Sequence, residues 1–147
     1  RTLIPADADA ALQVRLWDRL FDLYVMTPMQ AFTADLLRPE GERDPHGLAQ
    51  ARERLLSTYA LVDRQLEGRT WACGDAFSMA DCAAAPALFY ASTYVPLPPE
   101  HAALTAYFER LLAHPSVARV IDQARPWFRF YPGRAGLSRR FFDPAAA

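Results

Sequence analysis

The chain has 147 residues, of which 52% are hydrophobic, and a formal net charge of -1 at pH 7. This length suits one domain with a substantial core, and the composition excludes disordered and collagen-like proteins. No run of about 18 apolar residues indicates a membrane span, and the first five residues lack the apolar core of a signal peptide, so we expect a cytoplasmic protein without a membrane partner. All 16 basic residues are arginines, a bias typical of a GC-rich bacterial gene.

Residues 1–9 are expected to form a linker that ends in a helix N-cap, and a helical pattern of apolar residues begins at about residue 10. This helix carries an acid–base wedge and two apolar stripes. The wedge is Arg15, Asp18, Arg19 and Asp22, one stripe is Leu12, Leu16, Leu20 and Leu23, and the other is Val14, Trp17, Phe21, Tyr24 and Val25. Two apolar faces need two partners. One can face the core, and the other implies a neighbouring subunit, a missing domain or a ligand cleft.

Pro28 interrupts this pattern, because a proline inside a helix removes one backbone hydrogen bond. We therefore expect a bend near residues 25–27 before the helix continues towards Leu37. A loop at residues 38–43 follows. A second helix is then predicted to begin after Asp44 as its N-cap and to end before Gly68.

Residues 78–94 are predicted to form the central helix. Ser78 and Asp81 have the spacing of a capping box, in which the hydroxyl and the carboxylate each accept from a backbone N–H at the other position. Phe77 and Cys82 fall where a hydrophobic staple would fix the entry angle of the chain. Asp81 is the only charged residue of this stretch, so the helix should be buried among others. Ser78 is therefore committed to a cap rather than to nucleophilic chemistry.

Two further amphipathic helices are expected, one around Leu104 to Leu112 and one that begins after His114. Residues 10–130 would then form a helical bundle, and residues 131–147 an irregular tail packed on it. No segment shows strand alternation of useful length. The predicted class is all-α, with about five helices around the central one.

The end of the chain is locally basic, since residues 116–147 hold six arginines against two acids. Basic residues interleaved with aromatics suit single-stranded nucleic acid. We favour aromatics that pack on the domain beneath solvated arginines, because the rest of the chain has no basic face, and we expect no nucleic acid partner.

The residues alone indicate no catalytic centre. The three histidines lie far apart and lack the spacing of metal ligands, so no metal site is expected. No phosphate-binding loop, nucleophile elbow or metalloprotease pattern is present. Cys73 lies in a loop where nothing nearby in sequence would lower its pKa.

Several motifs resemble the C-terminal helical domain of the cytosolic glutathione transferases. They are Gly68-Arg69-Thr70-Trp71, the glycine–aspartate loop with the capping box at 74–82, Ala-Pro-Ala-Leu-Phe-Tyr at 85–90, Thr27-Pro28, His-Pro-Ser-Val at 114–117 and Arg-Pro-Trp-Phe at 125–128. The resemblance implies a thioredoxin-like domain before this one. That domain would carry the glutathione site and the activating Tyr, Ser or Cys, so no catalytic residue is expected in this chain.

The resemblance also implies that glutathione is the co-substrate and that this chain supplies the wall for a hydrophobic electrophile. The implied wall residues are Tyr24, Pro28, Met29 and Phe32, with Trp127 or Tyr131 closing the site from the tail. Each of them could equally be a core or interface residue. Asp18 or Asp22 could contact glutathione across a homodimer, or could be a solvated surface charge. The alternative function is a non-catalytic protein-interaction module of the same fold.

Overall fold

Helices and the loops that connect them make up residues 2–142, which is the part of the chain that this computed structural model describes. The first three elements follow one another without a break and are called the first rod below. Four more α-helices come after them. The bounds are α1 Ala8–Leu20, the π-helical turn Phe21–Met26, α2 Thr27–Leu36, α3 Pro45–Leu66, α4 Met79–Tyr94, α5 Ala102–Ala113 and α6 Pro115–Ala124. With the first rod counted once and the short 3₁₀ turns left aside, residues 2–142 form five helices and no β-strand beyond one isolated bridge, which confirms the all-α prediction.

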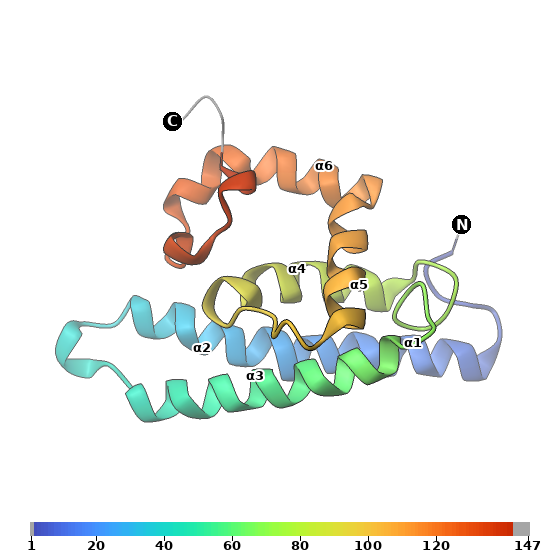
Figure 1. Cartoon of the computed structure of the whole chain (residues 1–147), viewed down its shortest axis with the longest axis horizontal. Helices are drawn as coiled ribbons and strands as arrows, with labels where there is room; N and C mark the ends of the chain where they lie inside the picture. The colour runs from blue at the N-terminus through green and yellow to red at the C-terminus, as the bar shows by residue number, and fades with distance from the viewer. Residues whose placement is uncertain (1, 143–147) are drawn as a thin grey trace.

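The first rod and α3 lie side by side along the long axis of the molecule (Figure 1). α4 packs against α1 and the π-helical turn, and α5 crosses to contact both α3 and α4. The largest wholly buried side chains come from four of these rods, and they include Phe21, Leu55, Tyr59, Leu88 and Tyr107. α6 follows α5 at the upper edge of the molecule, standing apart from α4 (Figure 1).

The π-helical turn Phe21–Met26 lies where the sequence predicts an irregularity, just before Pro28. Four successive core residues, Trp17, Phe21, Val25 and Met29, are spaced by four and are all buried. Four residues of α-helix turn the chain by about 400°, so this spacing would drift by about 40° at each step. The wider π-turn reduces that drift and keeps the apolar residues facing the core. The rod then runs on through α2 (Figure 1).

The two apolar stripes of the first rod face different surroundings. Val14, Trp17, Phe21 and Val25 are buried in the core. Four other residues are exposed and are called the outer stripe below: Leu12, Leu16, Leu23 and Tyr24, with exposed fractions of 62%, 56%, 55% and 52%. Leu20, which was expected in the same stripe as the three leucines, is instead partly buried against the core. The assignment of Tyr24 to the same stripe as Phe21 was wrong, because the π-helical turn changes the facing of the residues within it.

The capping box at the start of α4 is present. The wholly buried Asp81 accepts hydrogen bonds from the Ser78 N–H (2.8 Å) and the Ser78 hydroxyl (3.0 Å). It also accepts from the Ala72 N–H at 2.9 Å and the Tyr107 hydroxyl at 2.7 Å. These four donors make the burial of the carboxylate tolerable, and they join the 69–77 loop and α5 to α4.

One side of α4 is not covered, contrary to the expectation that this helix is buried all round. Cys82 and Pro86 are exposed on it, one turn apart, whereas Ala80, Ala84, Ala87 and Leu88 are buried. Pro86 lies inside the continuous helix. Phe77, which was expected to form a hydrophobic staple with Cys82, also contacts two other rings. It stacks on His114 at 3.9 Å and meets Trp71 edge-on at 5.0 Å.

The tail beyond α6 consists of short 3₁₀ turns. They span Arg125–Phe130, Arg134–Gly136 and Arg139–Phe141. Phe128 and Phe141 are buried, as expected of aromatics that pack back on the bundle, but Trp127, Phe130 and Phe142 are exposed, so that expectation holds for only part of the tail. The division into a linker, a bundle and a tail at 131–147 stays a prediction, and residues 1 and 143–147 lie outside the described part. No helix between residues 2 and 142 is long and apolar enough to cross a membrane.

Candidate functional site

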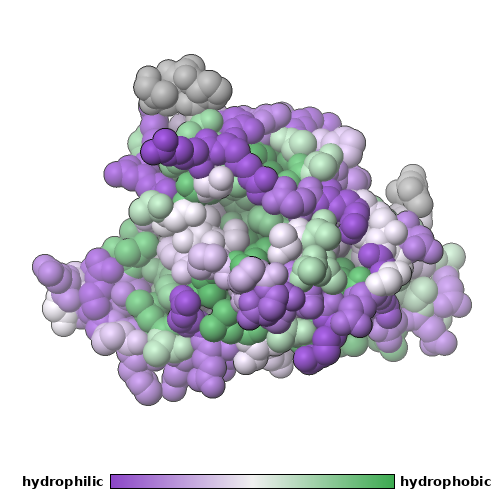
Figure 2. All heavy atoms as spheres, viewed as in Figure 1, coloured by the Kyte–Doolittle hydropathy of each residue, from purple (hydrophilic) through white to green (hydrophobic). Residues whose placement is uncertain are grey.

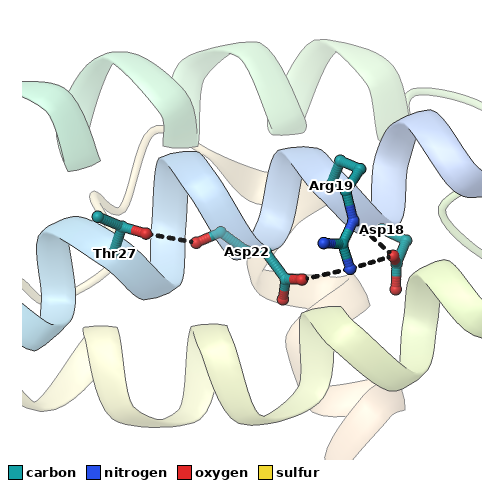
Figure 3. A network of polar contacts seen from close by, with 4 residues as sticks. All are labelled: Asp18, Arg19, Asp22 and Thr27. Atoms are coloured by element: carbon teal, nitrogen blue, oxygen red, sulfur yellow. Dashed lines mark hydrogen bonds and ion pairs between the residues drawn. The ribbon is translucent and has the colours of Figure 1, made fainter.

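Two acids on the first rod converge on one arginine (Figure 3). The Arg19 Nη2 atom lies 2.9 Å from an Asp18 carboxylate oxygen and 2.7 Å from one of Asp22. The hydrogen bond with Asp18 and the charge of Asp22 raise the pKa of Arg19. Asp18 and Asp22 therefore have a partner within the same helix, and the Asp22 side chain is the more accessible of the two, with 40% of its surface exposed against 14%.

The residues predicted to line an electrophile site do not all come together. Phe32 and Tyr131 both contact Tyr94: the Phe32 ring stacks on it at 5.3 Å, and the Tyr131 ring meets it edge-on at 6.0 Å. Met29 is buried and lies beside this group, since the Thr33 hydroxyl is 3.8 Å from its sulfur atom. Pro28 is also buried.

Trp127 and Tyr24 lie apart from that group. Trp127 is 66% exposed and pairs with the equally exposed Phe130, whose ring centroid is 6.3 Å away. Tyr24 borders a shallow depression that is otherwise formed by polar residues of α3 and Leu61. Only part of the predicted wall is thus assembled within the described chain.

Two hydroxyl pairs connect α2, α4 and the tail, and these four residues are called the hydroxyl cluster. Thr33 and Tyr94 are 2.7 Å apart, and Thr93 and Tyr131 are 2.9 Å apart. The Thr93 hydroxyl donates its hydrogen to the Tyr90 carbonyl, so Tyr131 is the donor in the second pair. Burial raises the pKa of Tyr131, so its hydroxyl stays protonated and able to donate well above neutral pH.

Tyr90 and Tyr94 hold this group together, and neither was predicted from the sequence as a site residue. The Tyr90 ring lies 5.1 Å from that of Tyr131, and Tyr94 is four residues further along the same helix. Residues four apart share a helix face, so the pair could have been found in the sequence. Their contact with Tyr131 could not, because it depends on the path of the tail.

An apolar cavity of about 360 Å³, called the α4–α6 groove below, lies between these two helices. α4 contributes Cys82, Pro86 and Phe89, and α6 contributes Val117, Val120 and Ile121. Phe77 and Tyr90 also line it. Figure 2 shows hydrophobic side chains in the hollow below α6.

The described residues offer few reactive groups. Both cysteines are free thiols. Burial raises the pKa of Cys73 to about 11, and burial together with the nearby Asp81 and Asp18 carboxylates raises that of Cys82. Both thiols are poor nucleophiles at neutral pH. Within residues 2–142 no group of three His, Cys, Asp or Glu side chains could hold a metal ion.

Comparison with known families gives one match, to the model described as glutathione S-transferase, C-terminal domain, over residues 45–122. A comparison with curated proteins found no significant match.

Solved glutathione transferases have the same fold. The enzyme from Methylobacterium radiotolerans, in complex with glutathione sulfonate, is 29% identical with a TM-score of 0.69, over 80% of this chain and 56% of that one. The enzyme from Methylobacillus flagellatus KT, with glutathione bound, is 26% identical with a TM-score of 0.72, over 80% and 59%. URE2P8 from Phanerochaete chrysosporium shares the fold at 17% identity, with a TM-score of 0.76, over 88% and 59%. The chain thus spans less than two thirds of each of these proteins.

Proposed function

This chain belongs to the glutathione S-transferase family through its C-terminal domain, and we propose that it forms the substrate-facing domain of a longer glutathione-dependent transferase. Two transferases that are 29% and 26% identical to it were solved with a glutathione derivative or glutathione bound. Both are longer than the region they share with this chain. In the proposed protein, a preceding thioredoxin-like domain binds glutathione and activates its thiol.

The observation that carries the proposal is the meeting of α2 and the tail at Tyr94. Phe32 and Tyr131 are 99 positions apart in the sequence, yet both rings contact the Tyr94 ring. An apolar aromatic surface with a few fixed hydroxyl groups is typical of a site for a hydrophobic small molecule. We assign the electrophile wall to Phe32, Tyr94 and Tyr131, beside the buried Pro28 and Met29.

The proposed reaction needs no nucleophile from this chain. The glutathione thiolate would attack the electrophilic atom and form the new bond to sulfur, while the leaving group departs with its electron pair. The aromatic wall would hold the electrophile close to the thiolate and exclude water from it. Trp127 and Tyr24 would join this wall only if the tail or a second subunit moves them towards it.

A homodimer is the second part of the proposal. The outer stripe of Leu12, Leu16, Leu23 and Tyr24 is an exposed apolar face on a helix whose opposite face is in the core. Such a face marks an interaction surface, and a second copy would bury it symmetrically. Of the two acids proposed to contact glutathione across the dimer, Asp22 is the better placed, because more of its side chain is accessible.

The same outer stripe also favours the alternative, a non-catalytic module that binds another protein. The sequence upstream of residue 1 distinguishes the two. An activating Ser, Tyr or Cys in a thioredoxin-like pattern supports the enzyme.

The experiment is an assay of the full-length protein with glutathione and 1-chloro-2,4-dinitrobenzene, with the 147-residue chain as the matched control. The full-length protein should form the conjugate, and the chain alone should not. Turnover by the chain alone would overturn the placement of the activating residue. A full-length protein that is folded, binds a protein partner and lacks turnover with a panel of electrophiles would favour the interaction module.

A further inference from the structure

We propose that the exposed aromatic turn at Trp127 and Phe130 binds the surface of an anionic membrane, with the neighbouring arginines contacting lipid phosphates. This surface is called the aromatic–arginine patch, and it consists of Trp127, Phe130, Arg129, Arg134 and Arg139. The inference goes beyond the proposed function and does not depend on it, because it uses only the tail of this chain. No membrane partner was expected from the sequence, which shows no membrane span and no signal peptide, but a contact at the membrane surface requires neither.

The first argument is the way the 3₁₀ turn Arg125–Phe130 divides its aromatic residues. Phe128 is buried and stacks on Phe89, with the ring centroids 5.5 Å apart, so this residue fastens the turn to α4. Trp127 and Phe130 are each 66% exposed, and their ring centroids lie 6.3 Å apart. Because a 3₁₀-helix has three residues per turn, positions 127 and 130 lie on the same side. The fold thus presents two large rings together to solvent on a firmly held turn.

The second argument is the shape of this surface. Neither Trp127 nor Phe130 lines the α4–α6 groove, although Phe128 between them does. Aromatic rings that extend into solvent suit the boundary between lipid headgroups and acyl chains, where Trp is enriched in membrane proteins. A peptide that binds through its own apolar side chains would instead require a groove to receive them.

The third argument is the charge around the two rings. Residues 125–142 contain five arginines and no acid. Two of these arginines form ion pairs with acids of α5 and α6. The other three, Arg129, Arg134 and Arg139, are exposed and have no carboxylate at ion-pair distance within residues 2–142. Guanidinium groups bind phosphate through paired hydrogen bonds, so these side chains suit lipid headgroups.

Contacts within the tail hold these charges next to the rings. The Arg129 guanidinium lies over the Phe130 ring, 4.8 Å from its centroid. Arg134 Nη1 donates a 2.7 Å hydrogen bond to the Arg129 carbonyl. Arg125 Nη1 donates to the Arg140 carbonyl at 2.6 Å, which brings the last 3₁₀ turn beside the first. The patch is therefore arranged before any partner arrives.

The charge of the whole chain is divided in a way that would orient it on such a surface. Residues 1–115 hold ten arginines and fifteen acids, whereas residues 116–147 hold six arginines and two acids. Figure 1 shows the tail on the far side of α4 from α3. An anionic membrane would attract the tail and repel the rest of the chain. A second copy is a poor partner for the patch, because two basic surfaces repel each other.

Single-stranded nucleic acid is the main competing partner for a basic aromatic surface. It binds by stacking successive bases on open ring faces. Here Arg129 already covers one face of Phe130. The Trp127 and Phe130 ring planes are inclined by 34°, so they do not form two parallel platforms. The geometry therefore favours the membrane surface.

Binding of the full-length protein to lipid vesicles tests the proposal. Phosphatidylcholine vesicles with and without phosphatidylglycerol are sedimented with the protein at low ionic strength. We expect the bound fraction to be about threefold or more higher on the anionic vesicles, and to fall to the neutral level in about 0.5 M NaCl, where charges are screened beyond about 4 Å. Equal binding to both kinds of vesicle at low salt would overturn the inference.

Two double variants assign the binding to the patch. Trp127→Ala with Phe130→Ala removes the rings, and Arg129→Gln with Arg134→Gln removes two charges. Each should lower binding to anionic vesicles about threefold or more. Circular dichroism checks that both are folded, and the arginine variant keeps the proposal testable if loss of the rings disturbs the tail. Full binding by either folded double variant would overturn the inference.

Matched controls separate the patch from general effects. Arg52→Gln with Arg64→Gln removes the same charge from exposed positions of α3, and Leu37→Ala shortens an apolar side chain that is 71% exposed. Both controls should bind anionic vesicles as well as the wild type. A loss in the α3 variant as large as that in the patch variant would show general electrostatic attraction and would overturn the assignment.

Tryptophan fluorescence tests whether the rings enter the membrane. Anionic vesicles with brominated acyl chains should quench the wild type more than Trp127→Phe, because the bromine atoms lie below the headgroups. The buried Trp17 gives the same background in both proteins. Binding with equal quenching of the two would overturn the proposed insertion of Trp127.

Other partners of the patch give different results. Vesicle binding by the 147-residue chain but not by the full-length protein would show that another part of the protein covers the patch, and would overturn the inference. Binding of a thymidine oligonucleotide that is lost in the patch variants, without vesicle binding, would assign the patch to nucleic acid and would also overturn it.

Discussion

The Tyr107 hydroxyl donates a 2.7 Å hydrogen bond to Asp81 Oδ1, and this contact joins α5 to the start of α4 through two wholly buried side chains. Asp81 also accepts from Ser78 and from the Ala72 N–H. Asp81 thus connects three segments, the 69–77 loop, α4 and α5, in addition to capping the end of one helix. Its removal should therefore cost more than the loss of an ordinary cap.

Replacing Asp81 by Ala should lower the free energy of unfolding by about 2–4 kcal/mol, which combines a lost cap with buried donors left unpaired. Thermal unfolding followed by circular dichroism measures this. Tyr107→Phe is the partial control: it removes one donor and leaves the other three, so the loss should be about 1 kcal/mol. A melting curve of Asp81→Ala that matches the wild type would show that the buried network does not form in solution.

The capping box was predictable, because its two residues are three positions apart and the pattern is local. Tyr107 was not, since it is 26 positions from Asp81 and reaches it only after α5 crosses the bundle. Tyr24 shows a second limit of prediction from the sequence. Its exposure results from a π-helical turn, and the 3.6-residue period assumed in a helical wheel does not represent that turn.

Only part of the electrophile wall was predictable, because contacts between residues far apart in the sequence depend on the fold. Phe32 and Tyr131 follow from the resemblance to the transferase family, but their meeting at Tyr94 depends on how the tail folds back over α4. Close approach of the tail needs glycine at two positions. A Cβ atom at Gly133 would lie 2.6 Å from the Tyr94 and Tyr131 hydroxyl oxygens, and one at Gly136 would overlap the Thr93 carbonyl oxygen.

Gly136→Ala should therefore displace the tail from α4 and destabilise the protein by about 1–3 kcal/mol, as overpacking does elsewhere. Gly41→Ala is the matched control, because nothing lies within 4 Å of a Cβ atom at that position. It should change stability by less than about 1 kcal/mol. Urea denaturation of both variants measures the difference. Similar midpoints for the two variants would show that the tail is not held against Thr93.

Thr27 supports the π-helical turn through its side chain as well as its backbone. Its hydroxyl donates to the Asp22 carbonyl at 3.0 Å, and its backbone N–H donates to the same oxygen. Thr27→Val keeps the shape and removes the hydroxyl, so it should cost about 0.5–1.5 kcal/mol, and Thr27→Ser should retain most of the stability. Chemical denaturation of the two variants tests this. Equal stability of Thr27→Val and the wild type would mean that the turn does not need the side-chain hydrogen bond.

Stability should fall in alkaline solution. Burial raises the pKa of Tyr59, and burial together with the Asp81 carboxylate raises that of Tyr107. The unfolded chain loses these protons near pH 10 while the folded chain keeps them, so the unfolded state binds fewer protons and stability decreases as pH rises above about 10. Each such tyrosine contributes up to about 1.4 kcal/mol per pH unit. Urea midpoints from pH 8 to pH 11 measure the decrease, which should be smaller in Tyr107→Phe.

Tyr94→Phe tests the assigned electrophile wall in the full-length protein. The ring that stacks on Phe32 remains, but the hydroxyl that pairs with Thr33 is lost, so the wall should become less fixed while the glutathione site is untouched. We expect KM for 1-chloro-2,4-dinitrobenzene to rise about two- to tenfold, with KM for glutathione unchanged, since a lost hydrogen bond of about 0.5–1.5 kcal/mol corresponds to that range.

Thr33→Val removes the same pair from the other side, so the double variant should be no worse than either single one. Trp127→Phe is the control outside the cluster and should leave both constants unchanged. An equal rise in both KM values for Tyr94→Phe would indicate a general structural effect, and the wall would then have to be sought nearer Trp127.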